Sequence, residues 1–141
     1  MKPKLLLRIA GTLMLLHTIG HTFGALSWKK APNTAVGSVI AGMQTNHFDF
    51  MGRSATLAYF YEGYGYSMIV VLLFISVLLW LLSSQPVARL VLLTAGLLLL
   101  LAGIEFIYFF AFAAAISFLA AVCTLIAFFK YPENQSSYEK P

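Results

Sequence analysis

Charged side chains are scarce in this sequence. They make up 10% of the 141 residues, whereas 60% are hydrophobic; a water-soluble domain carries about 25% charged residues. So little polar surface cannot cover a globule in water, which excludes an ordinary soluble domain and predicts lipid as the solvent. Nine Lys and Arg residues against five Asp and Glu give a formal net charge of +4. In a membrane protein this excess sets orientation, so we expect no nucleic-acid partner.

Cysteine is nearly absent as well. The single residue, Cys123, excludes a disulfide within the chain and leaves the redox compartment undefined. No C-x-x-C-H haem-attachment motif and no repeat of solenoid length is visible. The N-terminal apolar segment has no small-x-small cleavage site before Trp28, so we expect it to be a membrane span and not a signal peptide.

Long apolar segments are what the sequence does contain. A helix crosses a bilayer with about 20 apolar residues, and four segments satisfy this requirement, at about 5–28, 55–82, 87–109 and 112–130. The predicted fold class is therefore all-α, a polytopic membrane protein built as a four-transmembrane-helix bundle. We expect a single domain over residues 1–130, a main loop at 29–54 with a short amphipathic helix near 36–44, and a polar tail at 131–141.

The cationic residues predict an orientation. With four spans, one side would carry Lys2, Lys4, Arg8, Arg89, Lys130 and Lys140, and the other would carry Lys29, Lys30 and Arg53. The positive-inside rule then places both termini in the cytoplasm and the 29–54 loop outside the cell membrane, here expected to be a bacterial inner membrane.

Four ionisable residues of the spans are expected at the depth of the outer leaflet: His17, His21, Glu62 and Glu105. Such groups are costly in lipid and usually face the interior of a bundle. His17 and His21 share one helix face because they are four residues apart. Gly20 and Gly24 form a GxxxG pattern beside them, which predicts close helix approach on that face.

These residues favour a polar pocket that binds or acts on a small, largely apolar ligand. Glu105, His21 and Glu62 are the candidate acid–base groups, and His17 is a candidate ligand-binding residue. The remaining candidates line the mouth or close over it from the loop: Tyr59, Tyr61, Tyr64, Tyr66, His47, Asp49 and Arg53. For each group a plainer role stays open, namely an aromatic belt for the tyrosines, capping for Asp49 and hydrogen bonding between helices for the histidines.

Other functions fit parts of the same pattern, and the sequence does not decide whether the protein is an enzyme. His17 and His21 with Glu105 could hold a divalent metal. The absence of Glu-x-x-His argues against a di-iron site, and haem would need His47 to descend from the loop. Glu105 would be the coupling acid of a small transporter. Residues 29–58 would be the docking face of a structural subunit of a larger complex, and a homo-oligomer also stays open.

The segments GHTFG, MGRS and YEGYG, in a chain with four predicted spans, resemble a family of small bacterial four-helix membrane proteins. The layout is also similar to DoxX-like families and, more remotely, to sterol-isomerase-like membrane enzymes. The resemblance covers most of residues 5–129. It implies the fold and the membrane location, and it assigns no catalytic role to any residue.

Overall fold

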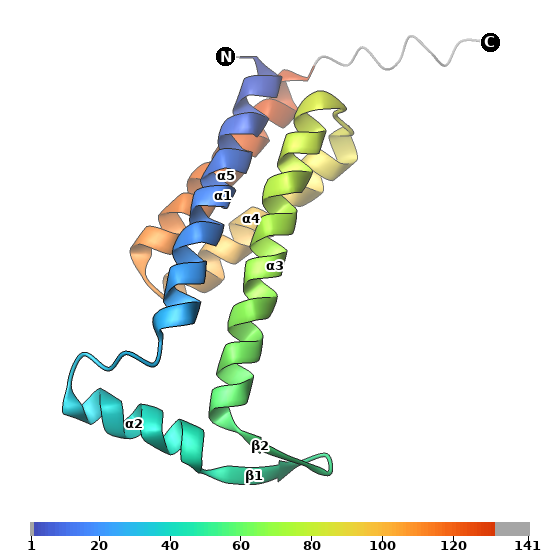
Figure 1. The fold of residues 1–141 in the computed structure, drawn as a ribbon. Coiled ribbons are helices and arrows are strands. Elements are labelled where there is room, and N and C mark those ends of the chain that lie inside the picture. The colour runs from blue at the N-terminus through green and yellow to red at the C-terminus, as the bar shows by residue number, and fades with distance from the viewer. Residues whose placement is uncertain (1, 132–141) are drawn as a thin grey trace. The chain divides into compact units, whose positions relative to one another are not determined.

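The structure, a computed structural model, describes residues 2–131, and it is helical along most of that length (Figure 1). The elements are α1 (Pro3–Ser27), α2 (Thr34–Thr45), β1 (His47–Phe50), β2 (Arg53–Thr56), α3 (Leu57–Ser84), α4 (Ala88–Tyr108) and α5 (Ala111–Lys130). Helices α1, α3, α4 and α5 are each long and apolar enough to cross a membrane. The all-α polytopic fold class is therefore confirmed, while the tail beyond residue 131, with Lys140, lies outside the described residues.

Short connections join the last three long helices. Pro86 lies between α3 and α4, where its ring and missing N–H prevent the helix from continuing. Helix α4 ends at Tyr108 with the Phe109 N–H donating to the Glu105 carbonyl at 2.9 Å, and α5 begins at Ala111. A connection this short favours two antiparallel neighbours, and α4 and α5 do pack along each other.

The chain divides into two compact units, and the single domain over residues 1–130 stays a prediction. The described part of the first unit comprises residues 2–17 and 73–131, so it contains portions of all four long helices. The second unit comprises residues 18–72: the end of α1, then α2, the two strands and the beginning of α3. Helices α1 and α3 each run through both units.

In the first unit, α1 and α3 approach closely at Gly11. The Ser76 hydroxyl of α3 donates a hydrogen bond of 2.8 Å to the Gly11 carbonyl. A Cβ at position 11 would lie 2.6 Å from Trp80 Cδ1, so only glycine leaves room for the indole. The guanidinium of exposed Arg8 lies 5.4 Å from the centre of the same ring, a cation–π contact. Gly11 therefore sets how closely the two helices pack.

The GxxxG pattern at Gly20 and Gly24 does not mark a close approach between described residues. A Cβ added at either position would meet nothing within 4 Å in the part of the chain that the structure describes. In the second unit the tight position is Gly65 of α3, where an added Cβ would lie 3.3 Å from Ala25 Cβ. The expectation fails because spacing alone does not tell which face of a helix meets a neighbour.

The second unit contains a β-hairpin that the sequence analysis does not anticipate. Strands β1 and β2 pair antiparallel, with Phe50 opposite Arg53. Met51 and Gly52 between them both have positive φ, 53° and 80°, which is the signature of a type I′ turn. Asn-Gly or Asp-Gly would have indicated this turn, and the Met-Gly pair does not. One face of the hairpin is aromatic, since the rings of Phe48 and Phe50 lie 6.0 and 5.0 Å from that of Phe60.

Side-chain oxygens cap the helices on both sides of the hairpin. Asn33 Oδ1 accepts a hydrogen bond of 2.9 Å from the Val36 N–H at the start of α2. Thr56 Oγ1 accepts one of 3.3 Å from the Tyr59 N–H at the start of α3. Each cap satisfies a backbone donor that has no partner within its helix, and so fixes where the helix begins.

Candidate functional site

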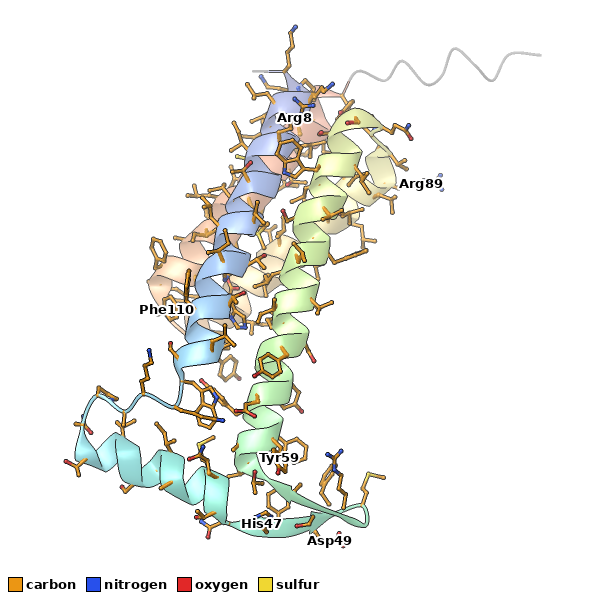
Figure 2. All side chains as sticks on the ribbon, in the orientation of Figure 1. Arg8, His47, Asp49, Tyr59, Arg89 and Phe110 are labelled. Carbon is orange, nitrogen blue, oxygen red and sulfur yellow. The ribbon has the colours of Figure 1, made fainter. Side chains whose placement is uncertain are left out.

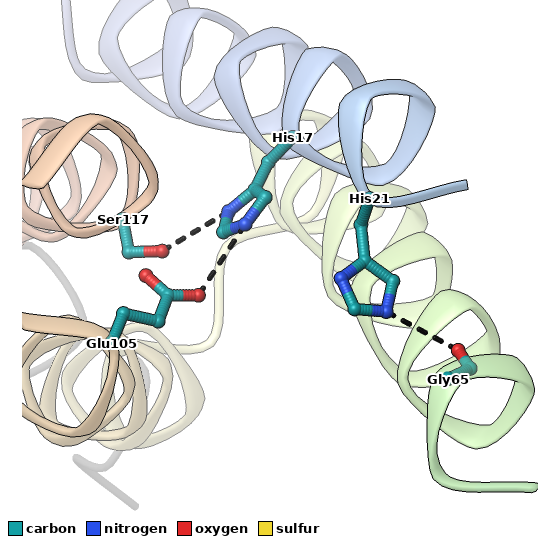
Figure 3. Close-up of polar contacts among 5 residues, drawn as sticks. All are labelled: His17, His21, Gly65, Glu105 and Ser117. Carbon is teal, nitrogen blue, oxygen red and sulfur yellow. Dashed lines mark hydrogen bonds and ion pairs between the residues drawn. The ribbon is translucent and has the colours of Figure 1, made fainter. Parts of the chain in front are cut away.

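His17 and Glu105 form a buried pair inside the first unit (Figure 3). His17 Nε2 lies 3.4 Å from Glu105 Oε1. The two residues are 7% and 4% exposed, so the protein interior surrounds both. Burial of this kind is costly for an isolated charge and tolerable for a pair.

Ser117 of α5 completes the cluster at the second nitrogen of the imidazole ring. Ser117 Oγ and His17 Nδ1 share a hydrogen bond of 3.2 Å, and Ser117 is fully buried. The three side chains come from α1, α4 and α5, and in Figure 3 the ring of His17 faces Ser117 and Glu105, which lie next to each other. Sequence reasoning missed Ser117. Its signal is a polar residue on the buried face of α5, which is otherwise mostly alanine.

Local sequence explains how α4 and α5 present these groups. Glu105 continues the buried stripe of α4 that contains Leu98, Leu101 and Ala102. Ser117 lies on a stripe of α5 whose other members are mostly alanines: Ala113, Ala114, Ala120, Ala121, Thr124 and Ala127. The Thr124 hydroxyl donates to the Ala120 carbonyl of its own helix at 2.7 Å. Small side chains around Ser117 allow the bulky imidazole to reach it.

The His17–Glu105 pair has no net charge when it holds one proton, whichever of the two side chains carries it. With the proton on the ring, a positive imidazolium faces a negative carboxylate; with the proton on the carboxyl group, both partners are neutral. The second carboxyl oxygen of Glu105, Oε2, is buried and has no hydrogen-bond partner within residues 2–131. In Figure 3 this oxygen lies on the side of Ser117, whose hydroxyl is near enough to interact with the Glu105 carboxyl group, although its hydrogen bond goes to His17 Nδ1. A buried oxygen without a partner is rare in folded proteins and suggests a further group at this point.

His21 has a different partner, inside the second unit. The ring is half-buried, and its Nε2–H donates a hydrogen bond of 3.2 Å to the Gly65 carbonyl of α3 (Figure 3). Because Gly65 lacks a side chain, its carbonyl is accessible to the imidazole. This contact is of the kind expected of a histidine that joins two helices.

Glu62 is paired with a lysine at the end of α1. Lys29 Nζ lies 2.5 Å from Glu62 Oε1, and the two side chains are 51% and 23% exposed. The hydrogen bond to Glu62 raises the pKa of Lys29, so this lysine stays charged at neutral pH. The neighbouring rings of Trp28 and Tyr61 are in contact, with their centres 4.8 Å apart and their planes tilted by 49°. An aromatic pair with a lysine is typical of a membrane–water interface.

The remaining predicted site residues are exposed. All four tyrosines, Tyr59, Tyr61, Tyr64 and Tyr66, show about half or more of their surface. His47, Asp49 and Arg53 lie on the hairpin, where His47 Nδ1 and Ser54 Oγ share a hydrogen bond of 3.2 Å (Figure 2). Of the predicted set, the structure thus brings His17 and Glu105 together, gives His21 and Glu62 other partners, and leaves the pocket-mouth role of the tyrosines as a prediction.

Metal ligands do not gather in the described part of the chain. Within residues 2–131, no three His, Cys, Asp or Glu side chains lie close enough to hold a metal ion. His17 and Glu105 supply two ligands, and structural or catalytic zinc sites use at least three from the protein. The metal hypothesis would need a ligand beyond these two.

An apolar groove of about 470 Å³ lies between α4 and α5. Its lining consists of Leu99, Ala102, Gly103, Phe106, Ala111, Ala114, Ala115 and Phe118. Ala102 and Ala114 also belong to the buried stripes that carry Glu105 and Ser117. Each alanine precedes its polar residue by about one helical turn. Only small side chains therefore lie at the inner edge of this groove.

Comparison with known proteins finds no match: no family model, no curated protein and no solved structure is similar to this chain. The four long apolar helices identify a multi-pass membrane protein in contact with the lipid bilayer. The resemblance to small bacterial four-helix families stays a prediction, as does the orientation with both termini in the cytoplasm.

Proposed function

We propose that this protein binds a small, largely apolar molecule within the membrane at the His17–Glu105–Ser117 cluster. The observation that carries the proposal is the buried oxygen of Glu105, Oε2, which has no hydrogen-bond partner within residues 2–131. Burying an acceptor without a partner costs about 1–3 kcal/mol. A ligand that donates an O–H or N–H to this oxygen recovers that free energy, so the expected ligand class is an alcohol, a phenol or an amide.

The groove between α4 and α5 supports an apolar body for this ligand. The lining residues of the groove are all apolar, which suits contact with an apolar molecule. Ala102 and Ala114 leave little side-chain bulk between the groove and the polar cluster. A flat or chain-like molecule would lie against Phe106 and Phe118, with its polar end directed toward Glu105.

The cluster also contains the groups needed for proton transfer. His17 Nε2 lies 3.4 Å from Glu105 Oε1, and Ser117 is hydrogen-bonded to the other ring nitrogen. A donor of the ligand at Oε2 would join this chain, so a proton could pass between ligand and imidazole through the carboxyl group. Acid–base chemistry on the bound molecule is therefore part of the proposal.

Native mass spectrometry of the protein, extracted gently in detergent, tests the binding. We expect an added mass of hundreds of daltons on the wild type that is lost in Glu105→Gln. In this variant the side chain keeps its size, and an amide NH₂ takes the place of an accepting oxygen. Loss of one buried hydrogen bond and a clash of two donors should weaken binding by about tenfold or more.

Glu62→Gln is the matched control, because Glu62 is also a glutamate of a span but is paired with Lys29. It should keep the added mass. A bare mass for the wild type would contradict the proposal and leave His17–Glu105 as a structural contact between helices. An added mass of tens of daltons would indicate a metal instead, and visible absorption of the bound species would indicate haem.

A further inference from the structure

Helix α2 is short, uncharged and exposed. Its 12 residues, TAVGSVIAGMQT, include no Asp, Glu, Lys or Arg, and only Ile40 is buried. In Figure 1 the helix follows an extended linker from α1 and leads directly into the hairpin. Within the second unit its tertiary contacts are few.

Such a helix would be marginal in water. Isolated helices shorter than about 12–15 residues are barely stable there even with favourable sequences. Gly37 and Gly42 each cost about 1 kcal/mol more than alanine inside a helix. The Asn33 cap offsets part of this. Something beyond the chain's own contacts must therefore stabilise α2.

The two faces of α2 differ in polarity. At 100° per residue, one side carries its larger apolar residues, Val36, Val39, Ile40 and Met43. The opposite side carries Thr34, Ser38 and Thr45. Val39 is 62% exposed and Val36 is 38% exposed, whereas Ile40 is buried and Met43 is half-buried, so the second unit covers only part of the apolar face.

The position of α2 in the chain keeps it close to a membrane surface. It lies between two spanning helices, α1, which ends at Ser27, and α3, which begins at Leu57. Consecutive spans leave the segment between them on one side of the bilayer. The linker 28–33 reaches at most about 3.6 Å per residue. At its start Trp28 and Lys29 form the aromatic and cationic pair typical of the interface.

We infer that α2 is an interfacial helix that lies in the plane of the bilayer surface. Its Val36–Val39–Met43 side enters the boundary between headgroups and acyl chains, and its Thr and Ser side faces water. The lipid supplies the apolar contacts that the second unit does not supply. Because α2 has no cationic residue, this binding does not depend on anionic lipids.

Spin labels on the two faces of α2 test the inference. The variants are Val39→Cys and Ser38→Cys, each in a Cys123→Ser background and reconstituted in zwitterionic phosphatidylcholine vesicles. The label at position 39 should collide with oxygen several-fold more than with a water-soluble nickel chelate, relative to the label at 38. The adjacent positions share one backbone environment, so a difference between them reports depth.

Two results would overturn the inference. Equal, high accessibility of both labels to the nickel chelate would place α2 in water. Shielding of both labels from both reagents would indicate a protein partner or a second copy of the chain. If Cys123→Ser fails to fold, Cys123 is kept and the signal of the labelled wild type is subtracted.

Discussion

Replacement of His17 alone by leucine is expected to destabilise the protein strongly, by about 3–5 kcal/mol. The variant removes the imidazole, so the carboxyl group of Glu105 stays buried without its partner. The double variant His17→Leu/Glu105→Leu should recover most of this loss, because two apolar side chains of similar volume need no partner. Thermal or denaturant unfolding of the wild type, His17→Leu, Glu105→Leu and the double variant in one detergent measures the effect.

His21→Leu is the matched control for that series. His21 is half-buried and bonded to the Gly65 carbonyl, so its removal should cost about 1 kcal/mol, the net value of one hydrogen bond. The buried pair is refuted if His17→Leu lowers the free energy of unfolding by no more than His21→Leu does. It is also refuted if the losses from His17→Leu and Glu105→Leu simply add in the double variant, because the two side chains then do not depend on each other.

Gly11→Val is the second change with a large expected effect. The first added carbon would lie 2.6 Å from Trp80 Cδ1 and 3.2 Å from the Ser76 carbonyl oxygen, so α1 and α3 would have to separate. Overpacking of this kind costs about 1–3 kcal/mol. Separation would also stretch the bond from the Ser76 hydroxyl to Gly11. Unfolding measurements in detergent should show a clear loss.

Gly96→Val in α4 controls for the general effect of valine in a helix. Nothing in the described chain lies within 4 Å of a Cβ added at Gly96, so this variant should be close to neutral or slightly stabilising. Equal losses for Gly11→Val and Gly96→Val would show that helix propensity, and not the contact with Trp80, determines the result.

The spans are predictable from the sequence because a membrane-spanning helix needs only a long enough run of apolar residues, and such a run is visible in a single sequence. The importance of Glu105 is predictable for a related reason, since a carboxyl group in an apolar segment needs a partner. The partners of Glu105 are harder to predict from the sequence. His17 is suggested by depth, whereas Ser117 depends on the rotation of α5, which an evenly apolar helix does not reveal.

Other features escape sequence reasoning because they arise from pairing in three dimensions. Met51 and Gly52 form the turn of the hairpin, and methionine is not a residue that indicates a type I′ turn. Gly11 is one of many small residues in apolar segments, and only the position of Trp80 makes it necessary. The GxxxG pattern at Gly20 and Gly24 has the expected spacing, yet a Cβ added at either glycine would meet no described residue within 4 Å.

Solid-state NMR of histidine ring nitrogens in bilayers tests the buried pair most directly, because the chain has only three histidines. Glu105→Gln should shift the ring resonances of one histidine, the one whose signals are missing in His17→Gln. Glu62→Gln should leave all three unchanged, since Glu62 is paired with Lys29. If Glu105→Gln also leaves all three unchanged, His17 and Glu105 are not in contact in the membrane and the proposed site does not exist.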